Sequence, residues 1–173
     1  MRRAKPTDEQ RRLEYLFRRH LKEQHNIDTE DWFEEGFIKE HLEGKHTLIP
    51  ASIFSSSANS GLSTLEIIVK YLRENVRMRN KKVATLLGRT PASVWITYRN
   101  ASRKSSKRMS AEKTDIFIPT SVVSEKALAV LEGVSLYLHQ HYHMRYNEIA
   151  KLLDRDQRTI WTACSRAKRK LAK

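Results

Sequence analysis

Residues 131–170 have the sequence LEGVSLYLHQHYHMRYNEIAKLLDRDQRTIWTACSRAKRK, and residues 65–104 have the sequence LEIIVKYLRENVRMRNKKVATLLGRTPASVWITYRNASRK. At a constant offset of 66 residues these stretches align without a gap and are identical at 14 of 40 positions. The identical pairs include Glu66/Glu132, Met78/Met144, Leu87/Leu153, Trp95/Trp161, Arg103/Arg169 and Lys104/Lys170. The chain therefore contains an internal duplication, which predicts that one supersecondary unit is built twice.

A short motif ahead of each stretch extends the duplication. The tetrapeptide IPAS at 49–52 recurs as IPTS at 118–121, which is 69 residues later. We define the first repeat as residues 47–104 and the second repeat as residues 115–173. The residues between them, 105–114, are polar and basic, and we expect them to form a flexible linker.

Each repeat is expected to form three helices. Ser63 and Glu66 have the spacing of a capping box, which would start the first helix of the first repeat. Thr90 precedes Pro91 as an N-cap, and Asp156 occupies the equivalent place in the second repeat. The expected helices span about 63–75, 81–87 and 91–104, and then about 125–141, 146–153 and 157–171. Strand signals are weak throughout, so the fold class that we expect is all-α.

Residues 1–46 precede the repeats and predict a helical hairpin. Its first helix opens near Thr7, and its second helix, at about 29–43, is strongly acidic and ends before Gly44. We expect this N-terminal hairpin to form a separate segment. Its acidic helix is a candidate contact for a protein partner.

The positive charge of the chain lies in the repeats. The 173 residues carry a formal net charge of +13, but residues 1–48 have a net charge of −1 and residues 49–173 have +14. The basic part is therefore a folded body of about 125 residues and not a tail. A basic domain favours a polyanion partner, because each Lys or Arg against a phosphate releases condensed counterions.

The composition also excludes several classes of protein. A single cysteine, Cys164, leaves no disulfide framework and no cysteine-rich zinc site. No apolar run approaches the roughly 18 residues of a membrane span, and no signal-peptide stretch opens the chain. We therefore expect a cytoplasmic, nucleoid-associated protein with no membrane partner. No phosphate loop, catalytic triad or carboxylate pair is evident, so we expect neither enzyme activity nor a cofactor.

One motif in the second repeat points to a family. Residues 146–153 (YNEIAKLL) are followed by a three-residue turn, by QRTI at 157–160 and by SRAKRKL at 165–171. This pattern resembles region 4 of bacterial sigma factors, the helix-turn-helix that reads an upstream promoter element, and it shares much with LuxR-type DNA-binding domains. The first repeat fits the motif at 82–88 but has Asn100 and Ser105 in place of the expected Arg and Leu.

The resemblance implies a fold and a function. It implies two tandem three-helix helix-turn-helix domains that bind double-stranded DNA, and hence a transcription regulator. It also implies RNA polymerase as an alternative partner, because sigma region 4 holds the polymerase. Residues 1–48 are too short and too acidic to be the promoter-melting domain of that family, so we do not expect a complete sigma factor.

A helical projection of 157–171 supports DNA binding independently of the resemblance. At 100° per residue, the inner face consists of Ile160, Cys164, Ala167 and Leu171. The outer face is polar and basic, which suits a major groove where Arg reads guanine edges and hydroxyl groups contact either base. The candidate DNA-binding residues are Gln157, Arg158, Thr162, Ser165, Arg166, Arg169 and Lys170. Lys170 is expected to meet a phosphate because it lies near the helix end.

The same projection of 91–104 gives a less polar outer face. Its candidate DNA-binding residues are Ala92, Ile96, Arg99, Asn100 and Arg103. Ala92 and Ile96 would meet either a thymine methyl group or a protein surface. The second repeat is therefore the stronger candidate for a DNA reader.

Two further sets of residues allow a functional or a structural interpretation. Trp95 and Trp161 lie about 100° from the inner face, where packing at the edge of the core is favoured over contact with a base. His139, His141 and His143 alternate along one segment, but no carboxylate or Cys accompanies them, so we expect no metal site.

Three functions remain open from the sequence. The first is sequence-specific binding of double-stranded DNA, which the basic outer faces of both repeats favour. The second is binding of RNA polymerase in the manner of sigma region 4, with DNA contact secondary. The third is RNA binding, for which the sequence lacks the aromatic platforms common in single-strand readers.

Overall fold

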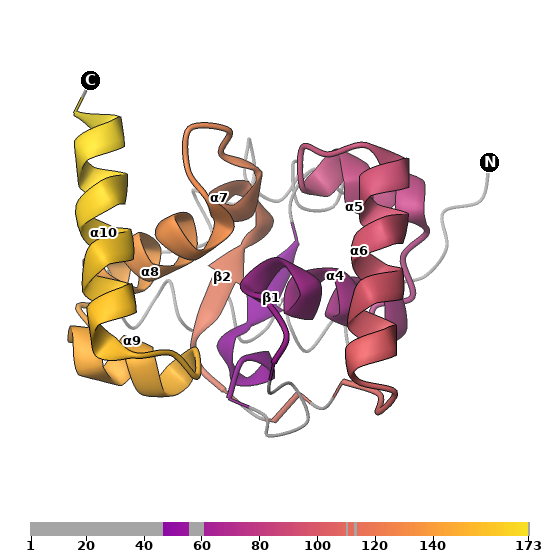
Figure 1. Ribbon diagram of the computed structural model, residues 1–173, viewed down its shortest axis with the longest axis horizontal. Helices are drawn as coiled ribbons and strands as arrows, with labels where there is room; N and C mark the ends of the chain where they lie inside the picture. The colour runs from indigo at the N-terminus through magenta and orange to yellow at the C-terminus, as the bar shows by residue number, and fades with distance from the viewer. Residues whose placement is uncertain (1–46, 56–60, 110, 113, 173) are drawn as a thin grey trace, which may run out of the picture. The chain divides into compact units, whose positions relative to one another are not determined.

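The computed structural model describes residues 47–55, 61–109, 111–112 and 114–172 (Figure 1). The N-terminal hairpin expected at 1–46 lies outside the described residues. The described part is mostly helical, with seven α-helices, one 3-10 helix and two strands of three residues each. The expected all-α class is confirmed in this respect.

Both repeats have the same order of elements, a strand, a short helix and three longer helices. In the first repeat these are β1 (Leu48–Pro50), η1 (Ala51–Ile53), α4 (Thr64–Glu74), α5 (Asn80–Leu86) and α6 (Pro91–Lys104). In the second repeat they are β2 (Phe117–Pro119), α7 (Thr120–Ser124), α8 (Val130–His141), α9 (Tyr146–Leu152) and α10 (Gln157–Leu171). The sequence analysis did not predict either strand. It also predicted one helix from about residue 125, whereas α8 begins at Val130.

Local hydrogen bonds determine where the helices begin. Ser63 Oγ accepts from the Glu66 amide at 3.2 Å, and the Ser63 amide donates to the Glu66 carboxylate at 2.7 Å. This reciprocal pair is the expected capping box. Thr90 Oγ1 accepts from the Ser93 amide, and Asp156 Oδ1 accepts from the Arg158 amide. The predicted bounds of α6 and α10 are therefore confirmed.

The turns before α6 and α10 have the same geometry. Gly88 and Asp154 occupy equivalent positions and have φ values of 61° and 50°. The next residue in each turn, Arg89 or Arg155, donates its amide to an alanine carbonyl of the preceding helix at 2.9 Å. This left-handed conformation suits Gly and is tolerated by Asp, so both residues close the preceding helix and redirect the chain.

The inner faces of α6 and α10 pack against the preceding helices of their own repeats. Ile160, Cys164 and Ala167 are fully buried, as the projection predicted. Leu171 is 56% exposed, so its assignment to the inner face is wrong. The reason is its position in the last turn of α10, which extends past α8 (Figure 1).

The two repeats share one core. The residues Ile49–Lys173 form a single compact unit, which we call the C-terminal unit. Strands β1 and β2 pair with each other, α4 contacts α8, and one continuous cluster of buried side chains includes members from both repeats. The Ala51 amide donates to the Ile116 carbonyl at 2.9 Å. The repeats are therefore halves of one body and not two tethered bodies.

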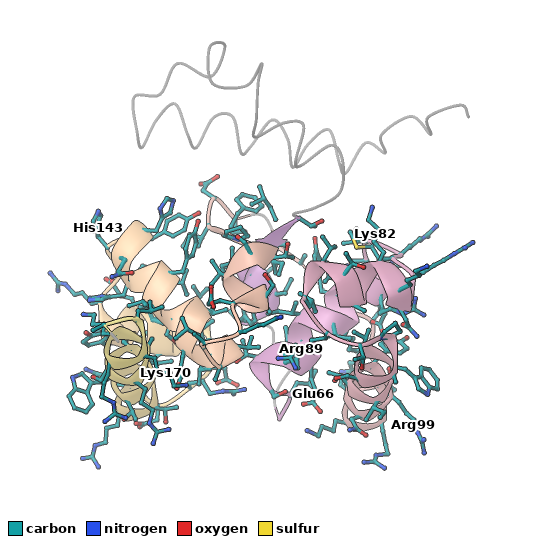
Figure 2. The ribbon with its side chains drawn as sticks, turned by 90° about the horizontal axis from the view of Figure 1, so that it is seen from above. Glu66, Lys82, Arg89, Arg99, His143 and Lys170 are labelled. Atoms are coloured by element: carbon teal, nitrogen blue, oxygen red, sulfur yellow. The ribbon has the colours of Figure 1, made fainter. Side chains whose placement is uncertain are left out.

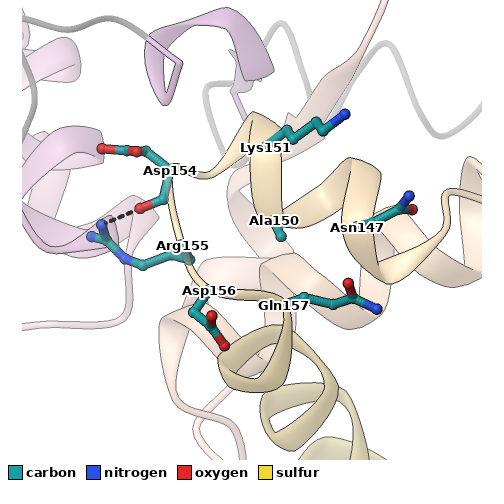
Figure 3. A pocket seen from close by; sticks show the side chains of 7 residues that line it. All are labelled: Asn147, Ala150, Lys151, Asp154, Arg155, Asp156 and Gln157. Atoms are coloured by element: carbon teal, nitrogen blue, oxygen red, sulfur yellow. Dashed lines mark hydrogen bonds between the residues drawn. The ribbon is translucent and has the colours of Figure 1, made fainter.

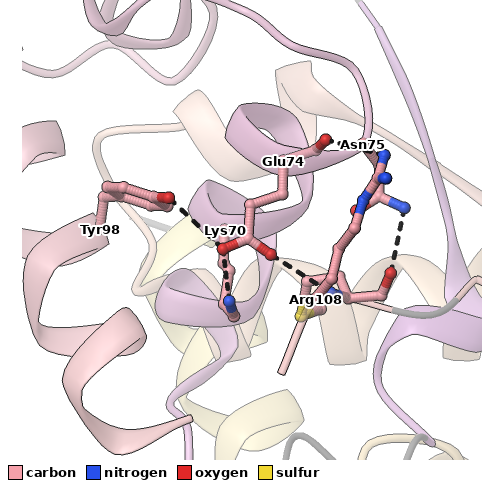
Figure 4. A network of polar contacts seen from close by, with 6 residues as sticks. Lys70, Glu74, Asn75, Tyr98 and Arg108 are labelled. Atoms are coloured by element: carbon pink, nitrogen blue, oxygen red, sulfur yellow. Dashed lines mark hydrogen bonds and ion pairs between the residues drawn. The ribbon is translucent and has the colours of Figure 1, made fainter. Parts of the chain in front are cut away.

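The segment 105–114 is fastened to the first repeat and is not a free linker. Met109 is 3% exposed, and its amide donates to the Glu74 carboxylate at 3.2 Å (Figure 4). The Asn75 side-chain amide donates to the Met109 carbonyl at 3.2 Å, and Arg108 donates to the Glu74 carbonyl. Glu74 also pairs with Lys70, which is buried. Composition alone predicted a flexible segment because most of its residues are polar or basic. The single methionine that anchors it does not change that composition.

Candidate nucleic-acid interface

Helices α6 and α10 lie at opposite ends of the C-terminal unit and on the same side of it. In Figure 1 both helices face the viewer, and in Figure 2 both lie along the lower edge of the unit. Arg99 of α6 points away from the unit at this edge, whereas Lys82 of α5 lies on the opposite side (Figure 2). We call the side that carries α6 and α10 the recognition side.

The charge on these two helices has one sign. Neither α6 nor α10 contains an Asp or a Glu. The basic residues of α10 are Arg158, Arg166, Lys168, Arg169 and Lys170, and those of α6 are Arg99, Arg103 and Lys104. Positively charged side chains on one helix repel each other, so the helix is stabilised when an anion binds against it.

The candidate residues of the second repeat come together on the outer side of α10. Arg158, Arg166 and Arg169 are exposed, as is Gln157 at the first helical position. The two hydroxyl residues, Thr162 and Ser165, are partly buried at the margin of this surface. The outer side of α10 thus presents three arginines and an amide to the solvent.

The candidate residues of the first repeat form a mixed surface on α6. Ala92, Arg99 and Arg103 are exposed, and Asn100 is partly buried. Ile96 is 56% exposed, which is a large apolar area on an otherwise basic helix. The outer side of α6 therefore offers fewer donors and more apolar surface than that of α10.

Four of the outward arginines have no partner among the residues that the structure describes, whereas the charge of Arg166 interacts with the Glu132 carboxylate. The guanidinium groups of Arg99, Arg103, Arg158 and Arg169 form no hydrogen bond and no ion pair there. Arg155, in the turn before α10, contrasts with them because it donates to the carbonyls of Asp154 and Leu62. Arginines without a partner are available for a ligand, whereas Arg155 is committed to the fold.

Lys170 has a structural partner that the sequence analysis did not assign. Its ammonium lies 2.7 Å from the Glu132 carboxylate, and the equivalent Lys104 lies 2.9 Å from that of Glu66. Both pairs tie the end of the last helix to the first turn of α8 or α4. All four residues are identical pairs of the duplication, a signal that could have revealed this ion pair. The ion pair of Lys170 with Glu132 therefore holds α10 against α8, and the Lys170 ammonium is not free for a phosphate.

The carboxylates of these pairs have lowered pKa values. For Glu66, burial raises the pKa, but hydrogen bonds from the Ser63 amide and from Lys104 outweigh it. For Glu132, burial is again opposed, by hydrogen bonds from Lys170 and from the Ala129 amide. Both carboxylates therefore remain charged to a lower pH than an ordinary glutamate does, and the ion pairs that fasten α6 and α10 persist with them.

The two tryptophans are exposed, which corrects the prediction that they pack at the edge of the core. Trp95 is 49% exposed and Trp161 is 57% exposed. The inner faces of α6 and α10 are narrow and consist of residues such as Val94 and Ile160, so an indole 100° away has no core to enter. Two equivalent, half-exposed indoles therefore lie on the same helices as the free arginines.

Two shallow hollows lie beside the start of α10. One is lined by residues of α9 and of the turn, among them Lys151, Asp154 and Asp156 (Figure 3). The other is lined by Tyr146, Asp156, Gln157, Arg158 and Trp161. Acidic and basic groups are mixed in both hollows, and the second also has two aromatic rings, those of Tyr146 and Trp161. Neither hollow brings together a nucleophile and a base.

The histidines and the cysteine have structural surroundings. His139 Nδ1 lies 2.9 Å from the Met144 carbonyl, and its ring lies 4.7 Å from that of Tyr146. His141 stacks on Tyr137 at 4.8 Å. Cys164 is buried, and burial raises the pKa of its thiol. In the described ranges no three residues of the types His, Cys, Asp and Glu gather into a group that could hold a metal ion.

Comparison of the chain with family models, with curated proteins and with solved structures gives no match. The likeness to sigma region 4 therefore rests on the residues that carry it. Within the described part of the chain, no helix is long and apolar enough to cross a membrane.

Proposed function

We propose that the chain is a double-stranded DNA-binding protein, a transcription regulator in which α6 and α10 are recognition helices. The observation that carries this proposal is the outer side of α10, where the exposed Arg158 and Arg169 have no partner among the described residues and the helix has no acidic residue. In this proposal α5–α6 and α9–α10 are two helix-turn-helix units, and their shared left-handed turn residues, Gly88 and Asp154, support that assignment.

Each outward group of α10 has a matching feature in a major groove. Arg158, Arg166 and Arg169 can donate two parallel hydrogen bonds to a guanine edge or to a phosphate. Gln157, near the start of the helix, can pair with adenine or a phosphate, since the first residues of a recognition helix contact the bases. The indole of Trp161 lies next to these groups and can pack against sugars or a thymine methyl group.

A second candidate function is favoured by α6 alone. The exposed side chains of Trp95 and Ile96 form an apolar area, which is typical of a protein contact. In this alternative, α10 binds DNA and α6 binds a protein such as RNA polymerase. An RNA ligand is less favoured, because A-form RNA has a narrow, deep major groove that does not admit a helix.

The test of the proposal is a binding assay with a matched control. Duplexes are first selected from random DNA with the full chain, and binding is then compared with single strands and RNA of the same sequence. We expect duplex DNA to be preferred, and we expect Arg169→Gln to weaken binding about tenfold or more. Lys82→Gln removes the same charge from the side opposite Arg99 (Figure 2) and should change binding less than threefold. Equal losses for both variants, or a preference for RNA, would contradict the proposal.

A further inference from the structure

Equivalent elements of the two repeats meet each other at the centre of the C-terminal unit. Strand β1 pairs with β2, and α4 contacts α8. A head-to-tail arrangement would instead bring unlike elements together. Contact between equivalent elements is the mark of a two-fold arrangement, in which the same surface of each half faces the other.

Contacts away from the centre also join the turn of each repeat to the other repeat. The turn of the first repeat approaches α7 of the second, since a Cβ at Gly88 would lie 3.3 Å from the Ser124 carbonyl oxygen. The turn of the second repeat approaches the segment before α4 of the first, where Arg155 donates to the Leu62 carbonyl at 2.5 Å. Each recognition turn thus leans on the segment that precedes the long helices of the other repeat.

This approximate two-fold relation extends to α6 and α10. In Figure 1 the first helix runs downward and the second runs upward, at opposite ends of the unit and on its recognition side. Dimeric helix-turn-helix proteins place two antiparallel recognition helices on one side in order to enter successive major grooves, about 34 Å apart. A compact body of about 125 residues has a radius of gyration of about 14 Å and therefore a diameter of roughly 36 Å, which is comparable to the spacing of successive major grooves.

We propose that the C-terminal unit acts as a dimer built into one chain, whose DNA target has two half-sites of opposite orientation at one fixed separation. This inference rests on the proposed DNA-binding function. The half-sites differ in sequence because equivalent outer positions of the two helices carry different residues. Ala92 is equivalent to Arg158, and Asn100 is equivalent to Arg166. The target is therefore inverted in geometry but not a true palindrome.

The fixed separation follows from the way the repeats are held. They share a buried core, a strand pair and the contacts of both turns with the other repeat, and Met109 fastens the segment that joins them. Neither recognition helix can therefore shift along the DNA independently of the other. Tethered domains, in contrast, tolerate a range of spacings, because their linker only sets a local concentration.

The experiment uses the full chain and a duplex obtained by selection, altered in two ways. In one series, two to five base pairs are inserted between the half-sites. Five base pairs move one half-site by about 17 Å and turn it to the far side of the duplex. In the other series, one half-site is reversed so that the two have the same direction. We expect either change to weaken binding at least thirtyfold, down to the affinity for a single half-site.

A control variant identifies the source of the spacing dependence. Arg158→Gln combined with Arg169→Gln disables α10, so binding through α6 alone should no longer depend on the spacing. If the unaltered chain binds every spacing and both orientations within threefold, the built-in dimer is wrong while DNA binding stands. If the chain binds no duplex at all, the proposed function fails and the inference fails with it.

Discussion

A core substitution in the second repeat should destabilise both repeats together. Leu138 of α8 is fully buried in the cluster that both repeats share, so Leu138→Ala removes apolar contacts from the centre of the C-terminal unit. Leu171 of α10 provides the matched control, because it is the same residue type in the same repeat but is 56% exposed. Both variants replace Leu with Ala, so a difference between their free energies of unfolding reflects the burial of the side chain.

The size of the effect follows from that burial. Replacing a fully buried leucine with alanine costs about 2–5 kcal/mol, from lost transfer free energy and from the cavity that remains. With a urea dependence of about 1.5 kcal/mol per M, a loss of about 3 kcal/mol lowers the midpoint of unfolding by about 2 M. Leu171→Ala should change the free energy of unfolding by less than about 0.5 kcal/mol.

The assay follows each repeat separately by tryptophan fluorescence. The chain has three tryptophans, so Phe at positions 32 and 161 leaves Trp95 as the reporter of the first repeat. Phe at positions 32 and 95 leaves Trp161 as the reporter of the second. Hydrogen exchange of the α6 and α10 amides, in the chain that keeps all three tryptophans, provides a second readout of each repeat.

The shared core predicts that both reporters have the same midpoint and that Leu138→Ala lowers both by the same amount. Independent repeats would behave differently, since only the Trp161 midpoint would fall. A Trp95 midpoint that stays within about 0.3 M of its original value would refute the claim that the repeats form one body.

Three further predictions concern DNA binding and the ion pairs. Arg158→Ala should cost about 1–3 kcal/mol on the selected duplex and less on a scrambled one; an equal loss in titrations of both duplexes would reassign this arginine to a phosphate. If six to ten phosphates are contacted, affinity should fall about a thousandfold or more between 50 and 200 mM salt, and a flat salt titration would remove the electrostatic argument. The pKa values of Glu66 and Glu132 are lower in the folded state than in the unfolded state, so these groups stabilise the fold above the ordinary carboxyl pKa, and this contribution is lost as the pH falls through the folded-state pKa values. Acid titration of Glu132→Gln should show a shallower loss of stability than the unaltered chain, and identical curves would contradict the ion-pair assignment.

The elements that local signals define were predictable from the sequence. The bounds of α6 and α10 follow from an N-cap residue, from Pro91 and from apolar periodicity, all of which act within a few residues. The inner residues of α10 were predictable for the same reason, up to Ala167. Leu171 was not, because its exposure depends on how far α10 extends beyond the other helices of its repeat.

The features that depend on the other repeat were not predictable from local patterns. A three-residue strand such as β1 or β2 has too few residues for a periodic signal, and its stability comes from its partner 69 residues away. The pairing of Lys170 with Glu132 spans 38 residues, and the burial of Met109 depends on α4. The duplication itself held a clue to the ion pairs, since Glu and Lys recur at the same separation in both repeats.

The most direct test of DNA binding through α6 and α10 is an NMR titration of the labelled chain with its selected duplex. If both helices enter the DNA, the largest amide shift changes should fall within 91–104 and 157–171 and in the turns before them, including Gly88 and Asp154. Amides of the buried faces of α4 and α8 should change little. Shift changes confined to α6, or concentrated outside both helices, would contradict the claim that both repeats present a recognition helix to one DNA duplex.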